Sequence, residues 1–310
     1  MPSLLDEDFL RKIDRLVLVS KRMRMGSLKG ARRSVKRGTS VEFADYRNYT
    51  HGDDLRQVDW NIYARLEKVF IKLFEEEEEL TVHILLDCSR SMDWSGPDSE
   101  LLEGEGGANP AYNKLWYAKR VAAAISYMGL AAMDRVTISG LSAVGNSNEL
   151  RMPIIRGKNQ TVRMIRFVEK LQAGGVENLN TSLRNYASQI RYGGLVFLIS
   201  DLLTPNGCFE GLRALQNAGF EVNVINVLSP DEINPVLRGD LKLVDIETGE
   251  VQEVSIDSKA LEMYRQEFNL WQREIIDFCQ RRAINYIQVD TTVPFDVLVL
   301  HYMRQRGLVA

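Results

Sequence analysis

The sequence is poor in the residues that build disulfide frameworks and zinc sites. Its 310 residues include only three cysteines, at Cys88, Cys208 and Cys279. An odd, widely spaced set with no Cys-x-x-Cys pair is typical of a protein from a reducing compartment. Its three histidines, at His51, His83 and His301, have no metal-ligand spacing with one another or with a cysteine, so we expect structural roles for them.

Long apolar runs and common enzyme signatures are also missing. No window approaches the roughly 18 consecutive apolar residues that a membrane span needs. Residues 1–16, MPSLLDEDFLRKIDRL, are interrupted by acids and bases and do not resemble a signal peptide. There is no Walker A motif, no Gly-x-Ser-x-Gly elbow and no His-Glu-x-x-His motif. We therefore expect a cytoplasmic protein without a membrane span that is not an enzyme.

The overall charge gives no general attraction to polyanions. Lys and Arg number 39 against 42 Asp and Glu, a formal net charge of −3, and the hydrophobic content of 45% suits a globular protein with a large core. The segment Lys21–Arg37 is basic and contains no acid, so it could neutralise phosphates. Because it lacks interleaved aromatics and any reading motif, we expect a solvated arm facing the acidic run Glu75–Glu79, and not a nucleic-acid partner.

The chain divides into a first part without a consistent period and a second part in which strands alternate with helices. In the first part, residues 3–24 are expected to form an amphipathic helix and VFIKLF a strand. From residue 80, we expect strands at 82–86, 135–139, 195–200, 222–227 and 284–289, and helices near 113–133, 159–171, 180–190, 208–218 and 258–282. Apolar strands separated by helices are typical of a parallel sheet with helices on both faces.

Two segments depart from this alternation. ELRMPII is expected to form a short antiparallel strand, and residues 240–256 a hairpin insertion that turns at Thr248–Gly249. We therefore expect an N-terminal module over residues 1–79 and an α/β domain over residues 80–310.

The stretch DCSRSM, residues 87–92, follows the apolar run TVHILL at the end of an expected strand. In extended backbone, side chains at alternate positions face the same way, so Asp87, Ser89 and Ser91 can face one point. Asp201 ends LVFLIS similarly, and ligands of open parallel sheets gather at the carboxyl ends of the strands. These hard oxygen ligands suit Mg²⁺ or Mn²⁺. Alternatively, the serines cap the next segment and Asp87 accepts backbone amides.

Two motifs carry a resemblance to known families. LLDCSRSM resembles the first loop of a von Willebrand factor A domain, whose metal-ion-dependent adhesion site uses Asp-x-Ser-x-Ser, and Asp201 matches the later aspartate of that site. The stretch EFADYRNYTHGDDLRQVDWNIYAR resembles the signature of domain-of-unknown-function family 58, with Tyr-x-x-Gly-Asp-Asp-x-Arg-x-x-Asp-Trp at Tyr49–Trp60. The tail NYIQVDTTVPFDVLVLHYMRQRGL fits the same family, so the resemblance runs from about residue 25 to the end.

This resemblance implies a von Willebrand factor A-like (Rossmann-like) doubly wound, mostly parallel sheet in a cytoplasmic protein often encoded beside a MoxR-type AAA+ ATPase. It further implies a non-enzymatic protein–protein interaction adaptor that works with this ATPase, or with its client protein, in chaperone-like assembly or maturation. The metal of an adhesion-like site would offer a coordination position to an acidic group on the partner.

One position departs from the adhesion-site pattern. Counting back from Leu183 in GGVENLNTSL puts Glu177 where the pattern has a threonine, and Thr181 would need a shifted register to serve. If Glu177 is a ligand, Asp87 and Asp201 join it to give three negative charges, which neutralise a metal from within or repel a partner's acid when the site is empty. Two other functions stay open: a metal-dependent phosphoester hydrolase and a metal-free scaffold with a degenerate site.

Two further stretches are conspicuous. Gly52–Arg56 with Asp59 and Trp60 could be a second functional site, but no nucleophile or base is recognisable beside it. We favour a turn and an ion pair that pin the N-terminal module to the sheet, with Trp60 buried. The Gly- and Glu-rich segment 93–113 is expected to be a flexible loop at the mouth of the proposed site, either gating it or forming a plain surface insertion.

Overall fold

The computed structural model of the chain describes residues 4–20, 41–50, 53, 55–76, 80–94, 113–145, 149–174, 178–190, 193–237, 239–245 and 249–309. The chain forms two compact units, which we call the sheet unit (residues 1–21 and 80–310) and the inserted unit (residues 22–79). The inserted unit ends at residue 79, and the sheet unit resumes at residue 80. The N-terminal segment, however, belongs to the sheet unit, because Leu4, Phe9 and Ile13 bury their side chains in its core.

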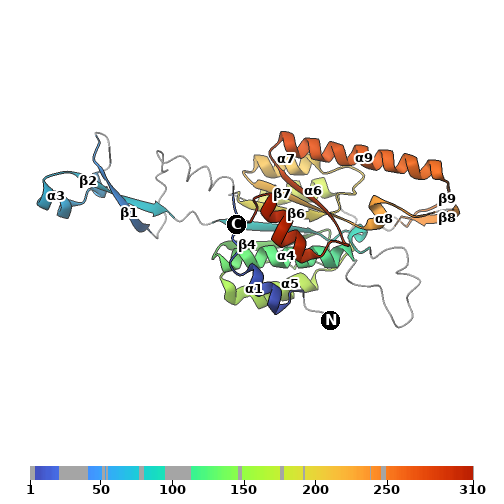
Figure 1. Cartoon of the computed structure of the whole chain (residues 1–310), viewed down its shortest axis with the longest axis horizontal. Coiled ribbons are helices and arrows are strands. Elements are labelled where there is room, and N and C mark those ends of the chain that lie inside the picture. The colour runs from blue at the N-terminus through green and yellow to red at the C-terminus, as the bar shows by residue number, and fades with distance from the viewer. Residues whose placement is uncertain are drawn as a thin grey trace. The chain divides into compact units, whose positions relative to one another are not determined.

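The centre of the sheet unit is a six-stranded sheet in the order β10-β7-β6-β3-β4-β5 (Figure 1). Its pairs are parallel except for β5, which runs antiparallel to β4. The strands span β3 (Thr81–Asp87), β4 (Arg135–Leu141), β5 (Ile155–Arg156), β6 (Leu195–Ser200), β7 (Glu221–Leu228) and β10 (Asn285–Asp290). The five expected parallel strands are confirmed. They are rich in Val, Ile and Leu because helices cover both of their faces.

Helices cover the sheet on two faces. The first face carries α1 (Glu7–Ile13), α4 (Lys114–Ala131), α5 (Thr161–Lys170) and the C-terminal turns α10 (Phe295–Val297), η6 (Leu298–Tyr302) and α11 (Met303–Gln305). The second face carries α6 (Leu179–Gln189), α7 (Phe209–Asn217) and α9 (Ser258–Arg281). The sequence therefore predicted the mixed α/β architecture correctly.

Helix α4 is the most deeply buried of the described helices. Its N-cap Asn113 accepts a hydrogen bond from the Trp116 amide, and most of its 18 residues are buried. Gly129 permits the close approach of α4 to the sheet, because a Cβ there would lie 2.9 Å from the Val136 side chain. The helix thus packs closely on the sheet near its end at Gly129, and its beginning is defined by the Asn113 cap.

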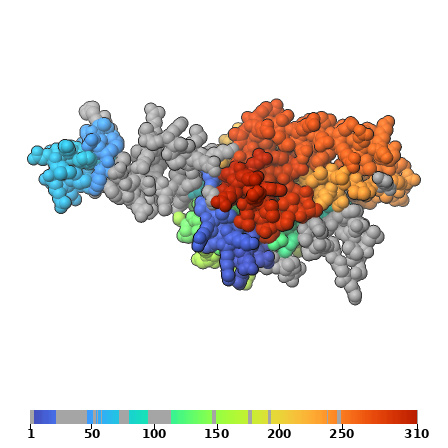
Figure 2. All heavy atoms as spheres, viewed as in Figure 1, coloured from blue at the N-terminus to red at the C-terminus, as the bar shows by residue number. Residues whose placement is uncertain are grey.

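The N-terminal helix is shorter than the sequence predicted. It ends at Ile13 instead of continuing to residue 20 and beyond. Leu18 forms an antiparallel bridge with Val309, and the Val19 amide donates to the Leu308 carbonyl at 2.9 Å. Pairing with the C-terminal tail therefore replaces the last turns of the expected helix. Figure 2 shows the N-terminal segment (dark blue) beside the C-terminal one (red).

Two antiparallel pairs complete the described structure. The expected hairpin insertion is confirmed as β8 (Gly239–Val244) paired with β9 (Val251–Ile256), and it follows the short helix α8 (Pro230–Ile233). In the inserted unit, β1 (Val41–Asn48) pairs with β2 (Phe70–Glu76), with η1 (Leu55–Gln57) and α3 (Trp60–Leu66) between them. The sequence predicted β2 but not β1. None of the helices in the described ranges combines the length and the apolar content that a bilayer crossing requires.

The acids of the Tyr49–Trp60 signature that the structure describes, Asp53 and Asp59, have local roles. Asp53 forms an ion pair with Arg47 of β1 at 2.6 Å, and this guanidinium together with Thr50 holds the pKa of the Asp53 carboxyl well below its usual range. Asp59 caps α3 by accepting the Asn61 and Ile62 amides. Trp60 is 60% exposed in the structure, so the expectation that it is buried was wrong. Residues 51, 52 and 54 of the signature lie outside the described ranges.

Candidate functional site

The candidate site lies where two neighbouring strands of the sheet end. Strand β3 leads into α4 on the first face, while its neighbour β6 leads into α7 on the second. The chain connections therefore diverge between the carboxyl ends of β3 and β6, which is where open α/β sheets bind ligands. Asp87 is the last residue of β3 and Asp201 directly follows β6, so the expected convergence of these two acids is found.

Asp87 is buried and held on both carboxylate oxygens. Its Oδ1 accepts the Ser89 amide at 2.9 Å, and its Oδ2 accepts the Ser200 hydroxyl at 2.5 Å. Burial, followed by the negative charge of Asp201, raises the pKa of Asp87 to about 6. The Ser200 hydroxyl that binds Asp87 belongs to the residue directly before Asp201, so the two acids lie at neighbouring strand ends although they are 114 residues apart in the sequence.

The two serines meet above Asp87. Ser89 Oγ and Ser91 Oγ are 3.0 Å apart, with Ser89 buried and Ser91 half-buried. Ser89 is the N-cap of the short turn η2 (Arg90–Met92), Ser91 lies within it, and the Arg90 side chain is exposed. As expected from the alternation, Cys88 faces the core, where burial raises the pKa of its thiol to about 12. Arg90 and, in part, Ser91 are therefore the residues of this turn that reach the surface.

Asp201 is engaged by a lysine that the sequence did not single out. Lys114 Nζ lies 2.8 Å from Asp201 Oδ2 and also donates to Glu232 Oε1. The lysine side chain is 0% exposed and that of Asp201 is 2% exposed, so this is an interior ion pair. Glu232 completes it from α8 with a side chain that is 20% exposed. Three elements of the fold thus converge on one ammonium group.

The second oxygen of each carboxylate is held by backbone amides. Asp201 Oδ1 accepts the Leu203 amide at 3.0 Å, and Glu232 Oε2 accepts the Ser229 amide at 2.7 Å within a capping box. Leu202, between Asp201 and Leu203 in the chain, has φ +58°. This left-handed conformation is costly for a leucine and recurs at functional sites. Both carboxylates are therefore fixed in orientation before any ligand arrives.

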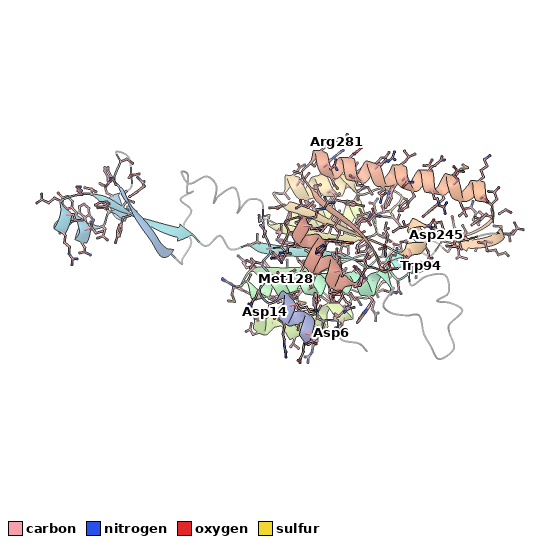
Figure 3. All side chains as sticks on the ribbon, in the orientation of Figure 1. Asp6, Asp14, Trp94, Met128, Asp245 and Arg281 are labelled. Atoms are coloured by element: carbon pink, nitrogen blue, oxygen red, sulfur yellow. The ribbon has the colours of Figure 1, made fainter. Side chains whose placement is uncertain are left out.

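The charges at this edge compensate one another. Burial alone would lower the pKa of the Lys114 ammonium, but the negative charges of Asp201 and Glu232 outweigh it and the pKa is raised. Lys114 also occupies the first position of α4, where the helix dipole disfavours a cation. Its backbone amide donates to the carbonyl of Trp94, which Figure 3 labels, at 3.1 Å. The lysine is therefore held in place by its two acids.

The fit of a divalent cation to these residues is limited by the lysine. Asp87, Ser89 and Ser91 offer suitable oxygens, but Asp201 already neutralises Lys114, and a dication beside a buried ammonium would be strongly repelled. No cluster of three or more His, Cys, Asp or Glu side chains within the described ranges could hold a metal. Glu177, the remaining candidate ligand, lies outside those ranges, and Thr181 lies in the first turn of α6.

Sequence signals for the missed residues did exist. A lysine at the first position of a largely apolar helix contradicts the dipole preference and indicates a specific acidic partner. The sequence Ser-Pro-Asp-Glu at residues 229–232 is a capping-box signature that places a carboxylate at a helix start. Neither signal identifies the partner, because the Lys114–Glu232 contact joins residues 118 positions apart.

A separate groove of about 590 Å³ lies along α5 on the first face. Basic side chains line it, including Arg163, Arg166 and Lys170, beside the partly buried Phe167. None of the residues of the candidate site described above lines this groove, so the groove is a separate surface.

Comparisons with known proteins give relatives whose names carry no activity. The chain is 28% identical over 245 residues to the uncharacterized protein Mb1516 of Mycobacterium bovis and equally to the uncharacterized protein Rv1480 of Mycobacterium tuberculosis, covering 78% of this chain and 72% of each relative.

Among solved structures, the chain is similar to the conserved hypothetical protein BatB from Bacteroides thetaiotaomicron, with a TM-score of 0.41 and 13% identity over 74% of this chain and 98% of that one. It is also similar to an aerotolerance-related membrane protein from Bacteroides fragilis, with a TM-score of 0.39 and 18% identity over 73% of this chain and 98% of that one. Residues 45–274 match a family model that includes the Tyr49–Trp60 signature, and the chain therefore belongs to the family described as "Protein of unknown function DUF58".

Proposed function

We propose that this protein is a non-enzymatic, cytoplasmic interaction adaptor with a von Willebrand factor A-like sheet unit. Its proposed partner is a MoxR-type AAA+ ATPase, or a client of that ATPase, in chaperone-like assembly or maturation. The observation that carries the proposal is the preorganised polar cluster at the carboxyl ends of β3 and β6, where Asp87, the two serines and Asp201 converge.

The strand order supports a von Willebrand factor A-like sheet. Counted by their occurrence within the sheet, the strands follow the doubly wound order 3-2-1-4-5-6, and the third runs antiparallel at the edge. The Asp-x-Ser-x-Ser loop follows the first of these strands, as the resemblance implies. This agreement supports the proposal that the candidate site corresponds to the binding loop of that family.

The hydrogen bonds at the site favour binding over catalysis. A general base must be within reach of a substrate proton, and Asp87 and Asp201 are only 4% and 1% exposed. Asp87 uses both oxygens on the Ser89 amide and the Ser200 hydroxyl, while Asp201 uses its oxygens on Lys114 and on the Leu203 amide. Carboxylates fixed in this way support a rigid binding surface at the carboxyl ends of β3 and β6, which we call the docking edge. The hydrolase alternative has no corresponding support.

The exposed groups at this edge suit an acidic partner. Arg90 is the exposed cation of the turn that contains Ser91, so it could form an ion pair with a carboxylate of the partner. Because Arg90 is exposed, replacing it tests docking without disturbing the fold.

The experiment measures the affinity of the purified chain for a MoxR-type ATPase from the same source, comparing Arg90→Glu with Arg163→Glu. Both arginines are exposed, but Arg163 lies in the α5 groove, so it is the matched control for a loss of positive charge. We expect Arg90→Glu to weaken binding by roughly tenfold or more and Arg163→Glu to leave it nearly unchanged.

Failure of the wild-type chain to bind the ATPase would remove the proposed partner. Equal losses in the two variants would remove the proposed docking edge. Turnover of a generic phosphoester that disappears in Asp201→Asn would instead support the hydrolase.

A further inference from the structure

The buried ammonium of Lys114 raises the question of what cation this site uses. Asp201 is the acid that the adhesion-site pattern assigns to a metal, yet its Oδ2 is 2.8 Å from Lys114 Nζ. The lysine reaches this position from the start of α4, the helix that follows the Asp-x-Ser-x-Ser loop. The ammonium therefore lies between Asp201, which follows β6, and Glu232 of α8, which follows β7.

The position is constructed as a cation site by elements distant in the sequence. Asp201 comes from the loop after β6 and Glu232 from α8 after β7, and each directs one oxygen to Lys114 while backbone amides hold the other. Lys114 is 0% exposed, so its side chain cannot leave without a local opening of the structure at the carboxyl ends of the strands. Its removal would leave two oriented carboxylates facing each other without a counter-charge.

We infer that Lys114 supplies the cation of this site, so that a tethered ammonium takes the place of the divalent ion and the docking edge works without metal. This inference rests on the proposed docking role of the same edge. A lysine has one charge and three hydrogen-bond donors at the end of a four-carbon stem, whereas Mg²⁺ needs six oxygens around it. Lys114 donates one hydrogen bond to Asp201 and one to Glu232. The hydroxyls of Ser89 and Ser91 are hydrogen-bonded to each other at 3.0 Å.

Cation binding to the full-length chain tests the inference directly. Mg²⁺ and Mn²⁺ alone are titrated by calorimetry into the wild type, Lys114→Met and Lys114→Gln. Methionine keeps the length of the stem without the charge, and glutamine also keeps hydrogen-bond donors for the two acids. Thermal melts in millimolar Mg²⁺ and in chelator provide a second readout.

We expect no ion binding by the wild type and no change in its Tm on chelation. The neutral variants should gain Mg²⁺ binding, with a Tm higher in Mg²⁺ than in chelator by roughly 5 °C. Adding Asp201→Asn to Lys114→Met should abolish this gain, because the vacated position then lacks one of its carboxylates.

Two outcomes overturn the inference. One is wild-type binding of Mg²⁺ or Mn²⁺ that is lost in Asp201→Asn. The other is a folded Lys114→Met or Lys114→Gln that binds neither ion, since the position would then not be a cation site. If neither variant folds in either buffer, the wild-type titration decides alone: binding overturns the inference and its absence supports it. These measurements need no partner protein, so they can fail or succeed independently of the ATPase-binding experiment.

Discussion

His83 provides a sharp test of how burial controls charge inside the sheet unit. It lies within β3 and is 2% exposed. Its Nδ1 is 2.8 Å from the Tyr186 hydroxyl, its ring packs edge-on against Phe220, and its Nε2 has no hydrogen-bond partner among the described residues. Burial, followed by the positive charge of Arg151, lowers the pKa of His83 from 6.5 to about 4.

The lowered pKa makes the stability of the sheet unit depend on pH in a defined direction. The unfolded histidine takes up a proton as the pH falls through about 6.5, while the native one stays neutral until about pH 4. His83 therefore contributes its full stability above the unfolded pKa, and this contribution is lost as the pH falls. At about 1.4 kcal/mol for each pH unit, the loss between about pH 7.5 and pH 5 is roughly 2 kcal/mol.

The assay is chemical denaturation followed by far-ultraviolet circular dichroism, for the wild type and for His83→Asn, across this pH range. Asparagine does not titrate, and the cost of its smaller size does not depend on pH. The free-energy difference between the two proteins should therefore change by roughly 2 kcal/mol in favour of the variant as the pH falls. Tyr186→Phe is the control, since it loses the hydrogen bond but keeps the titrating ring. A difference that stays constant with pH would refute the reasoning.

Two other changes have outcomes that follow from single contacts. Asp59→Ala removes the cap of α3 and the acceptor of the Tyr46 hydroxyl, so the free energy of unfolding of the inserted unit should fall by about 1–2 kcal/mol. Hydrogen exchange over residues 60–66 should become faster in Asp59→Ala and change little in Asp59→Asn. Unchanged exchange in Asp59→Ala would contradict this prediction. Phe9→Ala should cost the sheet unit about 3–5 kcal/mol in thermal or chemical unfolding, because the Phe9 ring is buried 4.5 Å from that of Phe295. A loss below about 1 kcal/mol would mean that the N-terminal segment is not part of the core.

The parts of the fold that sequence predicted are those determined by local patterning. Segments such as LVFLIS are short, apolar and β-branched because both faces of each strand are covered, and this leaves a signal that needs no partner. Asp87 and Asp201 were found for a related reason, since each directly follows such a run. Strand β1 was missed because its residues, VEFADYRN, alternate poorly and its pairing is fixed by β2.

The parts that sequence did not predict depend on contacts between distant residues. The apolar period around Leu16 and Val17 continues past α1, but Leu18 pairs with Val309 near the other end of the chain, and this contact ends the helix. Lys114 likewise has its role only because Asp201 and Glu232 are brought to it by two other strand ends. Local periodicity carries no information about such pairings.

The insertion of residues 22–79 between two segments of one folded body has a practical consequence. Leu18, before the insertion, and Val82, after it, both have side chains within 3.7 Å of the place where a Cβ on Gly129 would lie. The two attachment points are therefore close together, which is the arrangement that tolerates domain insertion and excision. A short Gly/Ser bridge from Lys21 to Leu80 should give a smaller protein that retains the proposed docking edge. Partner binding by the sheet unit could then be measured without the inserted unit.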